Sequence, residues 1–204
     1  MSTASAKRNP GRPREFDEDK ALDAAMMVFW KKGFDATSLS DLTDAMGINR
    51  PSLYSALGNK EELFQKALER YAQRNTRLFN ECLATATARE GIEKLMREAV
   101  KVFADPKNPG GCLGIQSVVT CSSVSSQFKK DRAGKRTEFE SMLKKRFDRA
   151  IDEGELPAGT ATLDLARYYS VVIQGLSIQA KAGGTQRELS RVVDVALGGW
   201  PAKT

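Results

Sequence analysis

Histidine is missing from the sequence, and this absence removes several kinds of enzyme chemistry at once. Without histidine there is no imidazole base to activate a serine or cysteine nucleophile, and no histidine ligand for a metal ion. The sequence also lacks a P-loop, a paired-glycine nucleotide fingerprint and a Cys-X-X-Cys motif. We therefore expect a protein that is not an enzyme and that uses no cofactor and no metal ion.

Cysteine is scarce, and its three residues, Cys82, Cys112 and Cys121, are widely spaced along the chain. Such spacing does not form a disulfide framework, which is typical of proteins from a reducing compartment. Long hydrophobic runs are missing too: no segment approaches the roughly 18 apolar residues of a membrane span, and no apolar signal-peptide core follows the basic N-terminus. These absences predict a soluble protein of the cytoplasm with no membrane partner.

What the chain does contain is an ordinary globular balance with unevenly distributed charge. Of its 204 residues, 41% are hydrophobic and 28% are charged, and the formal net charge is +6. This is enough apolar material for a substantial core. The first fourteen residues contain four cations, among them Arg12 and Arg14, but no acidic residue. Such a small, polar segment cannot bury enough surface to fold alone, so we expect a flexible basic arm over residues 1–14.

Apolar residues recur at helical spacing along nearly all of the remaining chain, and no alternation typical of a strand is visible. The first stripe, Leu22, Ala25, Met26 and Phe29, predicts a helix that ends at Gly33. Later stripes predict further helices, with apolar positions over 64–82, 92–103, 139–151, 165–176 and 189–200. The chain is therefore expected to be all-α.

Residues 34–60 predict two short helices separated by a tight turn at Gly47. Ser38 is expected to cap the first helix, with Asp41 completing a capping box, and Asn49 is expected to cap the second. A small core is predicted to set the angle between these helices, formed by Leu39, Leu42, Ala45, Ile48 and Leu53. The second helix has a polar outer face typical of a recognition helix in the major groove, built from Arg50, Ser52, Tyr54 and Ser55.

The run from Leu22 to Leu63 resembles the signature of the TetR family of one-component DNA-binding repressors. The matching elements are G-F-D-A-T-S at 33–38, D-L-T-D-A-M-G-I at 41–48 and L-Y-S-A-L-G-N-K-E-E-L at 53–63. The sequence departs from the family at Leu57, where phenylalanine is usual, and at 55–56, where an aromatic and histidine pair is common. The resemblance implies an N-terminal three-helix DNA-binding domain with a helix-turn-helix, residues 15–60, and a C-terminal helical ligand-binding and dimerisation domain, residues 61–204.

The resemblance also implies roles for individual residues. Phosphate contacts are implied for Thr37, Ser38, Tyr54 and Lys60, and base-edge contacts for Asn49, Arg50 and Ser52. Lys60 lies in the first turn of a predicted helix, whose N-terminus favours a phosphate, and Arg50 suits a bidentate contact with guanine. Two alternatives remain open: Arg50 as a solvated surface cation and Tyr54 as a core aromatic.

The basic arm offers a second DNA-binding element. Gly11-Arg12-Pro13 resembles the centre of an AT-hook, in which an extended arginine lies in a narrow minor groove, and Arg14 follows directly. The alternative is a disordered basic tail that adds only nonspecific affinity for phosphate.

The last two predicted helices are the most hydrophobic part of the chain. A stripe that ends at Trp200 suits a four-helix interface between two copies, so we expect a homodimer through these helices. The alternative is that the stripe completes the core of one monomer. A twofold dimer would bind a palindromic double-stranded DNA operator.

The resemblance implies a pocket for an unidentified small-molecule effector, and mostly apolar residues with a few amides are candidates for its lining: Met96, Phe103, Ile115, Gln116, Met142 and Gln174. The alternative is that all of them are plain core. Cys112 is a further candidate, because a helix that begins there would lower its thiol pKa, and with Cys121 it could sense oxidants or electrophiles. Its alternative is a small buried residue at a tight junction.

The main hypothesis is therefore a ligand-responsive repressor that binds a palindromic operator as a homodimer. The alternative is an architectural or oxidant-sensing DNA-binding protein without a small-molecule inducer. A cavity of roughly 300–1,000 Å³ within the helical body would favour the first.

Overall fold

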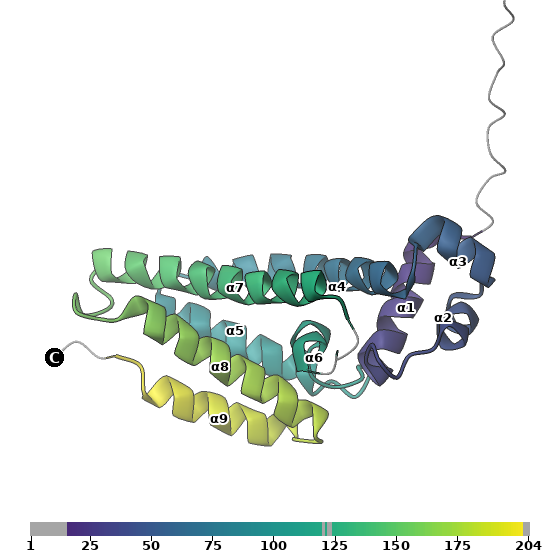
Figure 1. Ribbon diagram of the computed structural model, residues 1–204. Helices are drawn as coiled ribbons and strands as arrows, with labels where there is room; N and C mark the ends of the chain where they lie inside the picture. The colour runs from purple at the N-terminus through teal and green to yellow at the C-terminus, as the bar shows by residue number, and fades with distance from the viewer. Residues whose placement is uncertain (1–15, 120, 122–123, 202–204) are drawn as a thin grey trace, which may run out of the picture.

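The computed structural model describes residues 16–119, 121 and 124–201, and this part of the chain folds into helices joined by turns, without a strand. The prediction of an all-α chain is confirmed. The helices follow one another along the chain (Figure 1): α1 (Glu18–Lys32), α2 (Leu39–Met46), α3 (Arg50–Leu57), α4 (Lys60–Leu83), α5 (Ala88–Phe103), α6 (Leu113–Val119), α7 (Ser126–Asp152), α8 (Thr162–Lys181) and α9 (Gln186–Gly198).

The short N-terminal helices begin and end at the predicted signals. Ser38 and Asp41 form a complete capping box at the start of α2, and Asn49 accepts a hydrogen bond from a backbone N–H in the first turn of α3. Asn59 caps α4 in the same way. Gly47 ends α2 in the left-handed region at φ 65°, where a side chain would be strained. Each side-chain cap contributes about 1 kcal/mol, so these helix boundaries are set locally.

Helices α1–α3 pack on the first turns of α4 and form a small domain at one end of the molecule (Figure 1). Its core is rich in aromatic rings, with Phe64 in contact with both Phe29 and Phe34. The same core also contains side chains from α6 and the start of α7, including Leu113 and Phe128. The DNA-binding half of the fold is therefore closed by segments that lie far along the chain.

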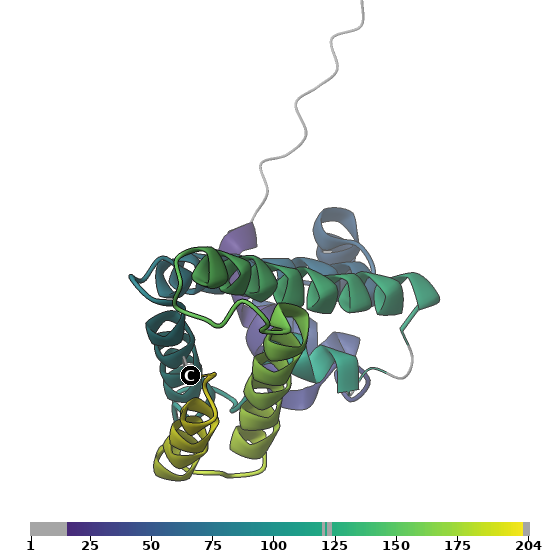
Figure 2. The same cartoon turned by 90° about the vertical axis from the view of Figure 1, so that its left-hand side faces the viewer.

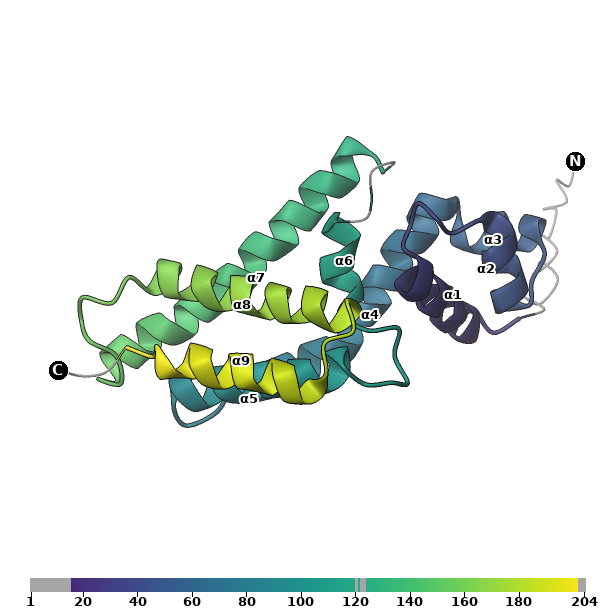
Figure 3. The same cartoon turned by 90° about the horizontal axis from the view of Figure 1, so that it is seen from below.

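A second core lies in the helical body and is formed by α5, α7, α8, α9 and the end of α4. In Figure 2, viewed along the body, these helices surround this core. Figure 3 shows that α7 diverges from α8 toward its N-terminal end, with α6 lying in the angle. Because α6 contacts α1, α4 and α8, it connects the two parts of the molecule.

The predicted core of the helix-turn-helix is correct in part. Leu42 and Leu53 are fully buried, and Leu39 and Ile48 pack against the same cluster while half-buried. Ala45, however, is exposed, and Met46 is buried in its place. The inward face of this eight-residue helix runs through positions 39, 42 and 46, so position 45 turns toward solvent.

The apolar stripe of α9 also differs from the expectation that it forms the contact between two copies. Leu189, Val193, Ala196 and Leu197 are buried within the monomer, against the second core. Most of the stripe therefore completes the monomer core, and Val192 alone among its α9 residues is exposed, at 49%.

The last residue of this stripe, Trp200, packs against Phe147 and Tyr169, with ring centroids 5.8 Å from each. Trp200 thus stabilises one monomer, and other side chains of α8 and α9 point outward.

In the described part of the chain, every helix is too short or too polar to cross a lipid bilayer.

Candidate nucleic-acid interface

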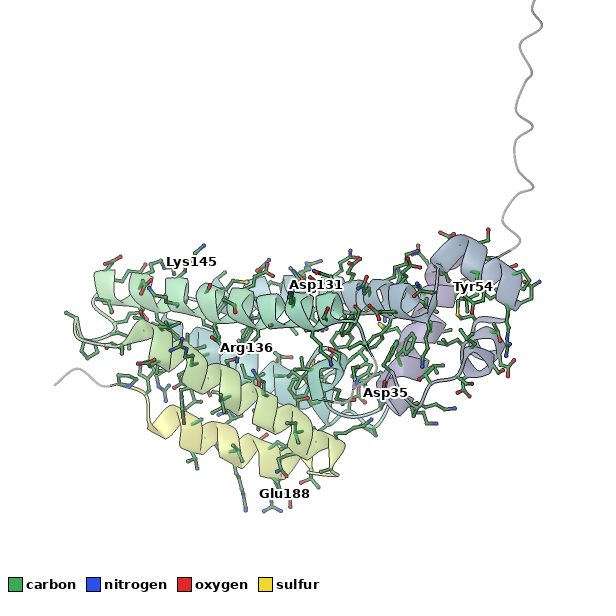
Figure 4. The ribbon with its side chains drawn as sticks, in the orientation of Figure 1. Asp35, Tyr54, Asp131, Arg136, Lys145 and Glu188 are labelled. Atoms are coloured by element: carbon green, nitrogen blue, oxygen red, sulfur yellow. The ribbon has the colours of Figure 1, made fainter. Side chains whose placement is uncertain are left out.

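The recognition helix α3 separates its apolar and polar residues as a DNA-reading helix requires. Leu53 and Leu57 are buried, whereas Arg50, Tyr54 and Ser55 are exposed. The Tyr54 side chain is 50% exposed, so it is not a core aromatic. Figure 4 places Tyr54 on α3, at the end of the molecule away from the body. This face is the part of the domain that is open to a DNA groove.

Arg50 is the first residue of α3, and its guanidinium Nη2 donates to the hydroxyl of Ser40 on α2 across 3.0 Å. No carboxylate forms an ion pair with Arg50 in the part of the chain that the structure describes. A cation at the exposed N-terminus of a recognition helix is placed to meet base edges. No local sequence signal points to Ser40, because its partner lies ten positions away along the chain.

Asn49 and Ser52 lie at the start of the same helix. The side-chain oxygen of Asn49 accepts a hydrogen bond from the Ser52 backbone N–H at 2.8 Å, which caps α3. This leaves the NH₂ group of Asn49 as its donor toward a base. The Ser52 side chain is half-buried beside it.

The two residues before α2 have different environments. Ser38 is exposed, and its hydroxyl accepts from the backbone N–H of Asp41 at 3.0 Å. Thr37 is only 2% exposed, and its hydroxyl donates to the carbonyl of Gly33 at 2.5 Å. The Thr37 side chain therefore stabilises the α1–α2 turn from inside the domain, which argues against the phosphate contact implied by the resemblance.

Lys60 is the first residue of α4 and is half-buried. Its ammonium lies 4.4 Å from the centroid of the Phe34 ring, a cation–π contact that restricts the side chain. Asn59 already accepts hydrogen bonds from the backbone N–H groups of Glu61 and Glu62. Because these two N–H groups are already bonded, a phosphate at this helix end would meet chiefly the Lys60 ammonium. The remaining candidates, Arg12 and Arg14, lie outside the described residues.

Two family models match the chain. The model of bacterial regulatory proteins of the tetR family matches residues 21–67. The model of the tetracyclin repressor-like C-terminal domain matches residues 88–196, more than half of the chain. The chain belongs to the TetR family. It is a DNA-binding transcriptional regulator and not an enzyme.

Named relatives of this TetR-family chain include repressors and a solved DNA complex. The HTH-type transcriptional repressor ComR of Escherichia coli (strain K12) is 33% identical over 205 residues, which cover 98% of this chain and 96% of ComR. The repressor BdcR of the same strain is 28% identical, covering 96% of this chain and 95% of BdcR. A cysteine mutant of the TetR-family regulator CifR, complexed with 26-bp operator DNA, is 40% identical with a TM-score of 0.88, covering 93% of this chain and 100% of CifR.

The residues predicted to line an effector pocket are spread over the helical body. Met96 and Phe103 are buried in the second core, and Ile115 packs against it. Gln116, Gln174 and Met142 are half-buried. The Gln116 amide donates to the Gly110 carbonyl at 2.8 Å, and the Gln174 amide donates to the Ser170 hydroxyl at 3.1 Å. Two surface hollows of about 440 and 450 Å³ lie between α4 and α7 and between α3 and α4, and none of these residues lines either one.

The thiol pKa of Cys112 is raised, whereas a lowered pKa was expected. Burial raises its pKa, and this effect exceeds the opposing hydrogen bonds from the Tyr71 hydroxyl and from the backbone of Ile115 and Gly114. The expectation is wrong because loss of solvation outweighs the helix start. Cys112 packs against both cores, and its backbone N–H donates to the Ser177 hydroxyl on α8 at 2.8 Å. The thiol thus lies where the DNA-binding domain meets the body.

Proposed function

We propose that this TetR-family regulator is a repressor that binds a near-palindromic operator as a homodimer and releases it when an effector acts on the helical body. One observation carries the proposal: α3 presents an exposed Arg50 and Tyr54 while its apolar residues are buried. A rigid helix with this division is suited to direct readout in the major groove. Likeness to ComR and BdcR supports repression, and likeness to the CifR complex supports binding to an operator.

Dimerisation is supported by large apolar side chains that α8 and α9 leave exposed. They include Tyr168, Val171 and Ile178 on α8 and Val192 and Val195 on α9. The Val195 side chain is 77% exposed, so it takes no part in the monomer core. The two helices lie side by side along one edge of the molecule (Figure 1), so two copies related by a twofold axis could cover this face mutually. Twofold symmetry of the dimer would then require twofold symmetry in the operator.

The proposed DNA contacts follow from exposure and hydrogen-bonding capacity. Arg50 would contact a guanine, assisted by the free amide NH₂ of Asn49 and by Ser52. Phosphate contacts are proposed for Ser38, Tyr54 and Lys60. Thr37 is omitted because its hydroxyl is buried and bonded to Gly33. Arg12 and Arg14 of the arm are proposed for the adjacent minor groove.

The effector is proposed to act on the second core, where Met96, Phe103 and Ile115 pack, together with the amides of Gln116 and Gln174 and with Met142 on α7. Because these side chains pack against neighbours, an effector has to stabilise an alternative packing of the body to change DNA affinity. A second candidate trigger is covalent modification of Cys112. Its position in contact with both cores favours this, since an adduct there would separate the DNA-binding domain from the body.

The test is to select bound sequences from fragmented source genome with the purified protein at near-physiological salt. We expect a near-palindromic site. R50A should lose the preference for one base in each half-site and K60A should only weaken binding, because a lost base contact removes specificity at its own position and a lost phosphate contact lowers affinity for all sequences. K145A is the matched control, because Lys145 is an exposed cation on α7, far from α3 (Figure 4). Recovery of no preferred sequence, with binding that disappears as salt rises, would leave only phosphate attraction and contradict the proposal.

A further inference from the structure

The contact between Arg50 and Ser40 joins the two helices of the helix-turn-helix on their exposed side. Ser40 is the second residue of α2, Arg50 is the first residue of α3, and their side chains are 3.0 Å apart at Oγ and Nη2. We propose that Ser40 is a positioning residue, which orders the guanidinium of Arg50 before DNA binds and so sharpens base specificity. This inference rests on the proposed function, because it requires Arg50 to contact a base.

The contact leaves Arg50 able to bind a base. A guanidinium carries five N–H donors, and the hydrogen bond to Ser40 uses one of them. The second N–H of Nη2 and those of the other nitrogens remain for the O6 and N7 acceptors of guanine. A hydroxyl partner also leaves the positive charge intact. By contrast, Arg70 on α4 is paired with the carboxylates of Asp19 and Asp23 on α1, which neutralise its charge.

The hydroxyl of Ser40 has no part in stabilising α2 itself. Ser38 and Asp41 form the capping box of this helix, and the Thr43 hydroxyl bonds to the backbone carbonyl of Ser40, not to its side chain. Ser40 is also exposed, so its replacement by alanine opens no cavity. We therefore expect S40A to leave the stability of the fold unchanged, which separates a positioning role from a structural one.

The expected effect on DNA binding follows from side-chain entropy. An arginine that is free in solution loses rotamer freedom when it docks on a base, and this loss opposes binding. When Ser40 already restricts the side chain, less freedom is lost on docking. Removing the hydroxyl should weaken operator affinity by about 2- to 10-fold, the range that corresponds to immobilising one flexible side chain.

A double-mutant cycle tests this directly. Wild type, S40A, R50A and S40A/R50A are each used to select sequences from a randomised duplex library, and affinity for the wild-type consensus duplex is then measured by fluorescence anisotropy. We expect R50A to lose base preference at one position of each half-site and S40A to reduce preference at that same position. S40A should have no further effect in the R50A background, and S40T, which retains the hydroxyl, should restore the preference. S141A, at an exposed serine on α7, is the matched control and should behave as wild type.

The remaining outcomes distinguish a failure of the Arg50 base contact from a failure of the positioning role of Ser40. A wild-type protein that selects no sequence, or an R50A protein that keeps full preference, would overturn the base contact and the positioning role together. If R50A loses the preference but S40A keeps it, the base contact stands and the role of Ser40 is wrong. If S40A weakens binding equally in both backgrounds, Ser40 acts on DNA independently of Arg50, and the positioning role is again overturned.

Discussion

The ring of Phe128 in α7 stacks on the ring of Phe64 in α4, with centroids 5.5 Å apart and an interplanar angle of 16°. Phe64 also contacts Phe29 of α1, so the first turn of α7 lies in the core of the DNA-binding domain. Beside this stack, the backbone N–H and the hydroxyl of Ser125 donate to the carboxylate of Glu61 in the first turn of α4. A displacement of α7 in the body would therefore disturb the helix end that carries the proposed phosphate contact.

Replacing Phe128 by alanine should destabilise the protein by about 3–5 kcal/mol, because the ring is fully buried and its removal leaves a cavity. The loss is measured as the change in free energy of unfolding from urea titrations. F139A is the matched control, since Phe139 is a half-buried phenylalanine on the same helix that contacts Phe79. Its loss should be clearly smaller. Equal losses for the two variants would show that α7 does not close the DNA-binding core.

The ion pairs between α1 and α4 should make stability depend on pH in the acid range. Hydrogen bonding to Arg70, with the charge of Arg74 nearby, lowers the pKa of Asp23 below its ordinary value of 3.8. A lowered pKa means that the ion pairs contribute fully above the unfolded-state value and that this contribution disappears as the pH falls through the folded-state value.

We therefore expect D23N to be less stable than wild type at pH 6 and to approach wild-type stability as the pH falls below about 4. Urea titrations at several pH values measure both curves. The control is E138Q, which removes an exposed carboxylate that pairs with Lys135 on α7. Its free energy of unfolding should differ little from that of wild type, both at pH 6 and below about pH 4. A D23N deficit that stays constant down to pH 2.5 would contradict the role of the Asp23 charge.

A charge on the exposed apolar face of α8 and α9 should dissociate the proposed dimer. In V195D a carboxylate would be buried between two copies without a partner, so the monomer should dominate and operator affinity should fall at least tenfold. Sedimentation velocity gives the oligomeric state and fluorescence anisotropy gives the affinity. V118D introduces the same change at another exposed valine, 63% exposed on α6, and should remain dimeric. A dimeric V195D would place the interface elsewhere.

Alkylation of Cys112 should be slow at neutral pH, because its raised pKa keeps the thiol protonated. The measurement uses a C82S/C121S variant, in which iodoacetamide can modify only Cys112, and follows the rate by mass spectrometry between pH 7 and 10. The rate should still be rising above pH 9.

The modified C82S/C121S protein should bind operator DNA more weakly, because an adduct would force apart the two cores that meet at Cys112. The triple variant C82S/C112S/C121S, treated with the same reagent, controls for modification elsewhere. Unchanged affinity after complete alkylation would remove the thiol as a trigger.

The sequence by itself determined the helical fold of this protein, its DNA-reading motif and its family. The physical reason is that these features depend on short-range interactions: Ser38 with Asp41 and Asn59 with Glu62 are three residues apart, and each cap decides where a helix begins. The alternation of buried Leu53 with exposed Tyr54 on α3 likewise follows from the helical repeat once the apolar stripe is known.

Only the tertiary structure decided which apolar faces meet and which polar groups lose contact with water. Thr37 is buried and Ala45 exposed because of how α1 and α2 pack, and the stripe that includes Val193 faces the monomer core because α5 covers it. The pKa of Cys112 is raised by neighbours from distant segments, and Ser40 meets Arg50 only after the turn has folded. Such contacts depend on how whole helices pack against one another, and short-range sequence patterns do not predict that packing.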